Sequence, residues 1–415
     1  MLHDRLTPIM IVKKLSTLAI LLCFTLLSAC GDDSPAQSEA TPPNTTGEAN
    51  GTTGSTSGEP VDTAQTPPIP PDTSGEPDSM AAPDEAPVPT DSTTAVDTQK
   101  TTNPDTAAPP MDTAPPMSDT MGSEDTATPP PEAIVRFIAV GDTGEGNPAQ
   151  YQVADGIAAR CAQEPEGCDF GLLLGDNFYD DGVDSPDDNQ FETKFQSPYA
   201  GLTFPFYITL GNHDLGGAGL NVFQIPHYVS YGVENEKWIF PSEYYEVELD
   251  LVHLISLHTN PLAYLGTTVD EQGAMVDQVM ASTQATWVFA FGHHPYRSNG
   301  KHGNAGSYEG IPGDLVFFGG EFRKFVEKHM CGKVDVYLCG HDHNLQWMSE
   351  PPGCDMALGI SGAGAKTTSM KDHGNNFDFE MKQLGFAYIE ASSTTLYVEF
   401  CDDFGELLFS TTLVK

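Results

Sequence analysis

The sequence has few basic residues for its length. Aspartate and glutamate together number 59, against 18 lysines and arginines, and the formal net charge is −41. A surface that binds nucleic acid usually needs a basic patch, so this class of function is disfavoured. The eight cysteines include no Cys-x-x-Cys pair, so the spacing typical of a structural zinc site is missing as well.

The apolar run near the N-terminus does not have the length of a membrane-spanning segment. The run LAILLCFTLLSAC follows Lys13 and Lys14, which is the order of a signal peptide, and it is too short for a comfortable span. The letters LSAC, ending at Cys30, resemble a bacterial lipobox, in which the cleaved chain begins with a lipid-bearing cysteine. We expect residues 1–30 to be a lipoprotein signal peptide, with an ordinary secretory peptide as the alternative. The protein would then be extracytoplasmic and anchored at the cell envelope or cell surface.

Residues 31–131 lack aromatic side chains and arginine, and their only lysine is Lys100. Proline, threonine, serine, aspartate, glutamate and glycine supply too little apolar surface to offset the entropy lost on ordering. This composition predicts a disordered acidic linker. The remaining segment, 132–415, has the size and apolar runs of one folded domain.

Six cysteines lie in the folded segment, where an oxidising compartment would allow disulfides. Cys161 and Cys168 are close enough in sequence for a local disulfide. Cys339 stands in an apolar run and is expected to be a buried free thiol. The sequence leaves the other pairings open.

Apolar runs and helical spacing alternate through the first part of this domain and predict an α/β fold. Later runs predict strands only, so we expect two packed sheets with helices outside. The expected strands are 134–142, 170–176, 205–214, a pair within 244–258, 286–294 and 334–343, and the expected helices are 148–160, 270–282 and 321–329.

Five of the apolar runs end in glycine followed by aspartate, asparagine or histidine. Ligands of α/β sheets bind at the carboxyl ends of strands, and glycine lets the chain turn sharply there. Mixed Asp, Asn and His ligands suit iron, zinc and manganese, and they are too many for one tetrahedral zinc. Two metal ions together can clamp a phosphoryl group during its transfer. The candidate ligands are Asp142, Asp176, Asn212, His293, His341 and His343.

The motifs GDTG, GDNFY, GNHD, GHHP and GHDHN resemble those of the calcineurin-like metallophosphoesterases. More narrowly, they are similar to those of the small tartrate-resistant purple acid phosphatases. The resemblance implies a four-layer α/β/β/α sandwich. It also implies an acid phosphatase that hydrolyses phosphate monoesters through attack of a metal-bound hydroxide.

The resemblance assigns a role to each motif residue. His213 would contact the phosphate or protonate the leaving group, and His302 would lie near the leaving group. Asp214 and Asp342 would support the ligands through hydrogen bonds. One metal, Fe(III), would be held by Asp142, Asp176, Tyr179 and His343, and a divalent iron, zinc or manganese ion by Asn212, His293 and His341, with Asp176 bridging.

The expected substrates are small phosphomonoesters or phosphoproteins, and the expected state is a monomer. One alternative is a phosphodiesterase or nucleotide hydrolase on the same scaffold, and a less favoured one is a non-catalytic surface lipoprotein. Two local questions stay open. His294 either contacts substrate or is structural, and the polar loop 366–382 either borders the pocket or is a plain surface loop.

Overall fold

The computed structural model describes residues 133–311 and 318–415. The expected signal peptide, Cys30 and the linker 31–131 lie outside the described residues. None of the helices in the described ranges is both long enough and apolar enough to cross a membrane.

Two seven-stranded sheets form the centre of the domain. The first has the order β14-β13-β12-β1-β2-β3-β4, in which β1 to β4 are parallel. Its strands are β1 (Val135–Val140), β2 (Phe170–Leu174), β3 (Phe206–Thr209), β4 (Trp238–Ile239), β12 (Gly385–Ala391), β13 (Thr395–Asp402) and β14 (Leu407–Val414).

The second sheet has the order β11-β9-β10-β8-β7-β6-β5. Strands β6, β7, β8 and β10 run parallel to one another. The strands are β5 (Tyr245–Leu249), β6 (Val252–Ser256), β7 (Trp287–Phe291), β8 (Val336–Cys339), β9 (Leu345–Met348), β10 (Ala357–Ser361) and β11 (Phe377–Met381).

The main hydrophobic core fills the space between the two sheets. Phe137 of β1 packs edge-on against Phe289 of β7, with ring centres 5.1 Å apart. All residues of β2 and β7 are buried, because a parallel strand covered on both faces needs apolar side chains on both. This explains why these strands are continuous apolar runs in the sequence.

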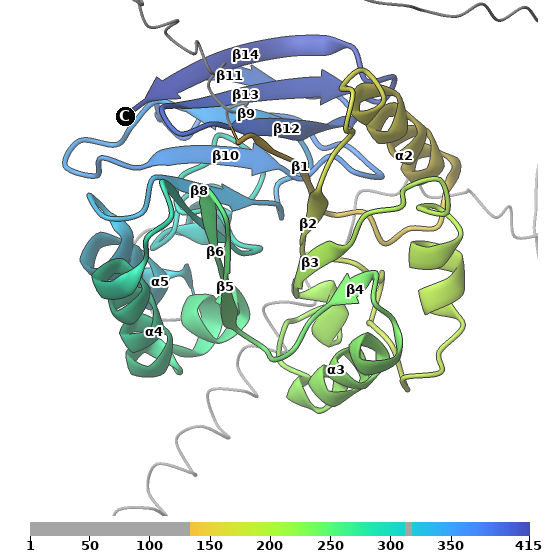
Figure 1. Cartoon of the computed structure of the whole chain (residues 1–415). Coiled ribbons are helices and arrows are strands. Elements are labelled where there is room, and N and C mark those ends of the chain that lie inside the picture. The colour runs from red at the N-terminus through yellow and green to blue at the C-terminus, as the bar shows by residue number, and fades with distance from the viewer. Residues whose placement is uncertain (1–132, 312–317) are drawn as a thin grey trace, which may run out of the picture. The chain divides into compact units, whose positions relative to one another are not determined.

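Helices cover the outer faces of both sheets (Figure 1). Helix α2 (Pro148–Cys161) is tied to the first sheet by the buried pair between Arg160 and Glu399 of β13, at 2.6 Å. A second core joins β6, β7 and β8 to α4 (Val269–Ser282) and α5 (Gly320–Phe325). The remaining α-helix in the described ranges is α3 (Ile225–Glu234). The predicted sandwich with two sheets and outer helices is confirmed.

The structure corrects two local predictions. The segment 366–382 is not wholly a loop, because its end forms β11, which pairs with β9 at the edge of the second sheet. Phenylalanine and methionine alternate with acidic residues in FDFEM, and this period of two is the signal that was missed. The helix expected at 321–329 is α5 followed by one wider turn over Val326–Met330.

The two predictions made for individual cysteines are confirmed. Cys161 and Cys168 form a disulfide, and Cys339 is a buried free thiol. A second disulfide joins Cys331 to Cys354. It connects the end of the helical segment after α5 to the loop before β10, which are 23 residues apart.

Candidate metal centre

The carboxyl ends of β1, β2, β3, β7 and β8 meet at one edge where the two sheets come together. Hydrogen bonds between the loops fix this meeting. The backbone N–H of His341, after β8, donates to Asp142 Oδ2, after β1, at 2.8 Å. The ring of His293, after β7, bonds through Nδ1 to the carbonyl of Leu174 in β2, at 2.9 Å. The sequence motifs at the strand ends therefore form one site.

Two glycines make this close approach possible. A Cβ atom on Gly211 would lie 2.1 Å from Asp176 Oδ1, and one on Gly340 would lie 2.4 Å from Asp142 Oδ2. Any side chain at these positions would push against a predicted ligand. The glycine before Asn212 and the glycine before His341 are therefore required by space.

The first group of predicted ligands surrounds the hydroxyl of Tyr179. This oxygen lies 3.1 Å from Asp142 Oδ1, 3.0 Å from Asp176 Oδ2 and 3.3 Å from His343 Nε2. All four side chains are buried. One carboxylate oxygen from each aspartate and one nitrogen of His343 lie within 4.8 Å of one another, close enough to hold one metal ion.

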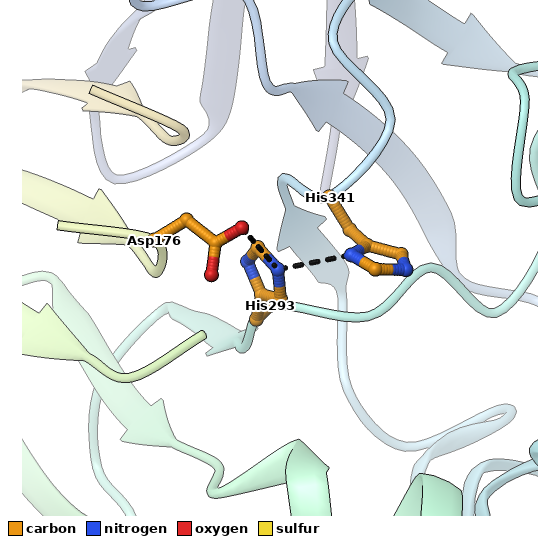
Figure 2. A group of neighbouring side chains, drawn as sticks. All are labelled: Asp176, His293 and His341. Carbon is orange, nitrogen blue, oxygen red and sulfur yellow. Dashed lines mark hydrogen bonds and ion pairs between the residues drawn. The ribbon is translucent and has the colours of Figure 1, made fainter. Parts of the chain in front are cut away.

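The second group surrounds Nε2 of His293. This nitrogen lies 3.1 Å from Asn212 Oδ1, 3.0 Å from His341 Nδ1 and 3.3 Å from Asp176 Oδ2. Figure 2 shows Asp176 and His341 on either side of the His293 ring, with their polar atoms turned toward it. Because Nδ1 of His293 faces the Leu174 carbonyl, it carries the proton of the neutral ring and leaves the Nε2 lone pair facing the other ligands.

The donor atoms of both groups are of the kind that metal ions bind. Carboxylate and amide oxygens are acceptors, a neutral imidazole ring has one acceptor nitrogen, and one phenol proton cannot satisfy every acceptor around Tyr179. Burying so many acceptors together is unfavourable unless cations neutralise them. Asp176 belongs to both groups, so the residues fit a pair of ions. That Asp176 bridges them, and that Tyr179 and Asn212 are ligands, stay predictions.

The metal-free site balances its charges with protons. Burial lowers the pKa of His293, but the charge of Asp176 and the hydrogen bond between the two side chains raise it more, to about 9. Burial raises the pKa of Asp176, but the charges of His293 and His213 outweigh burial and hold it well below its usual range. Burial and the charges of Asp142 and Asp176 raise the pKa of Tyr179 well above its ordinary value, so its phenol keeps its proton until a cation displaces it.

Three predicted ligands have left-handed backbone conformations, which residues other than glycine rarely adopt. The φ angles are 58° for Asp142, 53° for Asp176 and 69° for His341. Such strain costs about 1–3 kcal/mol per residue and is concentrated at functional sites. It points each side chain into the space where the strand ends meet.

Two further aspartates, Asp214 and Asp342, hold the loops of the predicted ligands in place through hydrogen bonds, as expected. Asp214 accepts hydrogen bonds from the backbone N–H groups of Asn177, Phe178 and Gly211, at 2.8 to 2.9 Å. It thereby joins the loop after β2 to the loop after β3.

Asp342 holds the loop that carries His302. Its carboxylate accepts from the backbone N–H of His302 at 2.8 Å and from the hydroxyl of Ser298 at 2.5 Å. These bonds tie the loop after β7 to the loop after β8, from which Asp342 itself comes.

Both predicted catalytic histidines lie beside the ligands and are held through Nδ1. His213 Nδ1 donates to the carbonyl of Asp180 at 2.7 Å, and its ring centre is 4.4 Å from that of Tyr179. His302 Nδ1 contacts the carboxylate of Glu309, and its ring centre is 4.1 Å from that of His341. In each case Nε2 is the ring nitrogen that the predicted catalytic role would use.

His294 is buried and bonded on both sides. Its Nδ1 lies 2.8 Å from Thr259 Oγ1, and its Nε2 lies 2.8 Å from the hydroxyl of Tyr264. Thr259 Oγ1 also accepts from the backbone N–H of His293, at 3.2 Å. These contacts on both ring nitrogens give His294 a structural role next to the predicted ligand His293. Sequence spacing gave no sign of Thr259 and Tyr264, because they come from the segment after β6.

Comparison with known proteins agrees with this geometry. A sequence profile of the family described as Calcineurin-like phosphoesterase matches residues 135–345. Tartrate-resistant acid phosphatase type 5 of Sus scrofa is 27% identical over 331 residues, covering 71% of this chain and 91% of that protein. The chain is thus homologous to acid phosphatases along nearly their whole length.

Two solved structures share the fold at 19% sequence identity. GAP50, the anchor in the inner membrane complex of Plasmodium, has a TM-score of 0.54 and is matched over 68% of this chain and 90% of its own. Purple acid phosphatase PPD1 of yellow lupin has a TM-score of 0.51, over 68% of this chain and 54% of its own. At this identity the likeness shows the fold alone.

The pKa of His293 predicts how metal binding depends on pH. Below a pH of about 9 the metal-free protein carries a proton on His293, and a metal ion must displace it. We expect the apparent affinity for Zn²⁺ to rise about tenfold per pH unit between about pH 6 and pH 8, with one proton released per ion. Titration calorimetry in buffers of different ionisation enthalpy measures both quantities. A pH-independent affinity without proton release would contradict the charge balance described above.

Proposed function

The chain belongs to the calcineurin-like phosphoesterases, and on this premise we propose that it is a dinuclear-metal acid phosphatase that hydrolyses phosphate monoesters. The observation that carries the proposal is the pair of ligand groups that share the buried carboxylate of Asp176. The homology to tartrate-resistant acid phosphatase supports the monoester specificity. We further propose that the protein acts as a monomer on small phosphomonoesters or phosphoproteins.

The ligand types suggest which metal each group holds. We propose Fe(III) for the group with Asp142, Tyr179 and His343, because a phenolate and carboxylates are hard anionic ligands that suit a trivalent ion. The group with Asn212, His293 and His341 has neutral ligands besides the shared Asp176, and it suits divalent iron, zinc or manganese. When bound, the two ions supply the nucleophile and neutralise charge on the phosphoryl oxygens.

The histidines beside the ligands complete the chemistry. His213, held at Nδ1 by the Asp180 carbonyl, presents Nε2–H to a phosphoryl oxygen when it is protonated. Burial lowers the pKa of His302, but the Glu309 carboxylate outweighs burial and raises it above its ordinary value. His302 therefore keeps its proton in mildly acidic solution and can donate it from Nε2 to the leaving oxygen.

A phosphodiesterase or nucleotide hydrolase would use the same ligands, so a panel of monoesters, diesters and nucleotides separates these activities. The fold shared with the anchor protein GAP50 at 19% identity does not support a non-catalytic role, because at that identity only the fold is shared. The complete set of buried ligand types in this chain favours catalysis.

Colour and activity test the two-metal proposal together. We expect the iron-loaded protein to be purple, because a phenolate bound to Fe(III) gives a charge-transfer band. The Tyr179→Phe variant should lose the band.

The Asp176→Asn variant tests the shared carboxylate. Its kcat should fall by at least about 10²-fold to 10³-fold, the range for losing one electrostatic stabiliser. A colourless, iron-free but active protein would refute the iron while keeping the phosphoesterase, and near-normal turnover of Asp176→Asn would refute the shared carboxylate.

Leaving-group dependence tests the role of His302. We expect His302→Ala to slow hydrolysis of alkyl phosphates by about 10²-fold or more, because poor leaving groups need the proton. p-Nitrophenyl phosphate has a good leaving group and should be affected much less. Rates on both substrates, measured for the variant and the unaltered protein, give the comparison. Equal losses on the two substrates would contradict the assignment of His302 as the acid.

We also propose that the protein is anchored outside the cytoplasm through lipid on Cys30. The support is the sequence LSAC after a basic and an apolar segment, since an acyl chain gives membrane affinity without a spanning helix. We expect Cys30→Ser to move the protein from the membrane fraction to the soluble fraction or to leave it unprocessed. Cys23→Ser, in the same apolar run, is the matched control and should stay membrane-bound. Membrane attachment of a Cys30→Ser protein that has been processed to the mature size would exclude the lipid anchor.

A further inference from the structure

A lysine side chain lies against the ring of Tyr179. The ammonium nitrogen of Lys366 is 3.5 Å from the ring centre, which is the geometry of a cation–π interaction. The same nitrogen lies 2.8 Å from Glu145 Oε1. The two charged side chains are only 23% and 27% exposed, so water and salt screen them less than charges on an open surface.

The backbone on both sides of Lys366 is fixed to the site. Asn147 Nδ2 donates to the carbonyl of Ala365 at 3.1 Å, and the N–H of Thr368 donates to the carbonyl of His343 at 2.8 Å. Glu145 and Asn147 come from the loop after β1 that also carries Asp142. The position of Lys366 is therefore determined by the ligand loops, and this start of the segment 366–382 borders the site.

The contact is made with the ring of the tyrosine whose hydroxyl points into the first ligand group. Lys194 also reaches Tyr179, but it contacts the backbone carbonyl. Of the cation–π contacts found in the described part of the chain, only that of Lys366 involves a predicted ligand. Lys366 is thus placed to act on the electrons of the phenol ring.

A positive charge over an aromatic ring lowers the energy of its π electrons. When the ring belongs to a phenolate ligand, these are the electrons that the ligand gives to the metal. A cation at the ring makes the ligand a weaker donor, so more energy is needed to move an electron from the ring to Fe(III). A weaker anionic donor also stabilises Fe(III) less, which makes the metal easier to reduce. Groups outside the ligand set are known to tune metal sites in this way.

We propose that Lys366 is a positioning residue of the metal centre that acts through Tyr179. Its ammonium group, held by Glu145 over the ring, shifts the phenolate-to-iron charge-transfer band to shorter wavelength and raises the reduction potential of the iron. This inference rests on the proposed function, because it assumes that Tyr179 binds Fe(III).

The experiment compares visible spectra and reduction potentials of four iron-loaded proteins of equal metal content. Lys366→Met keeps the length of the side chain and removes its charge, so we expect a band at longer wavelength and a lower reduction potential. Lys366→Arg keeps a cation that stacks on aromatic rings and should stay close to the unaltered protein. Lys371→Met removes an exposed charge from the same segment and is the matched control, with no expected shift.

The outcomes separate the two proposals. If the unaltered protein has the tyrosinate band and Lys366→Met leaves both band and potential unchanged, Lys366 has no tuning role and the proposed function stands. Equal shifts in Lys366→Met and Lys371→Met would show a general charge effect, which also overturns the role. If the unaltered protein binds no iron and has no band, the iron proposal fails, and this inference fails with it.

Discussion

The carboxylate of Asp176 is the point at which the two halves of the site are joined. Its Oδ1 accepts the backbone N–H of His213 at 2.8 Å, and its Oδ2 faces Tyr179 at 3.0 Å and His293 at 3.3 Å. The loop after β2 that carries this residue therefore contacts the loop after β3 in its own sheet and the loop after β7 in the other. A displacement of this side chain would separate both ligand groups at once. The left-handed backbone of Asp176 and the missing side chain of Gly211 are the local features that allow its position.

Gathering buried acceptors around Asp176 is unfavourable, and the rest of the fold offsets this in two ways. Backbone N–H groups bond the supporting carboxylates Asp214 and Asp342, so the loops keep their geometry without help from the ligands. A proton on His293 supplies a positive charge, and the proton that Tyr179 keeps prevents a further negative one. A metal ion that binds here would have to displace these protons, and loops that are held by their own hydrogen bonds favour the preorganisation that electrostatic catalysis requires.

The sequence predicted those parts of the site that depend on local pattern. Each strand end combines an apolar run with a glycine and a polar residue within a few positions, and parallel strands bring their carboxyl ends together in any sheet of this kind.

The residues that contact the predicted catalytic and supporting groups were not predictable in the same way. Glu309 at His302 and Glu145 at Lys366 depend on how separate loops cross. The Cys331–Cys354 disulfide depends on the approach of two segments that no spacing rule connects. Strand β11 was missed although its alternating pattern is visible, because polar residues and glycines precede it.

The charge of the whole chain restricts how a phosphate ester reaches this centre. A protein with a net charge of −41 repels anions at a distance, so attraction must arise locally and act over a few ångströms. The predicted catalytic residues His213 and His302 are candidates for such groups, because they stand beside the predicted ligands and are held through Nδ1. The negative charge of a phosphate monoester and of surface carboxylates decreases as the pH falls. Acidic conditions therefore lower the electrostatic barrier to substrate entry and also keep the proton on His302. The acidity of the chain and the raised pKa of His302 favour the same pH range for the reaction.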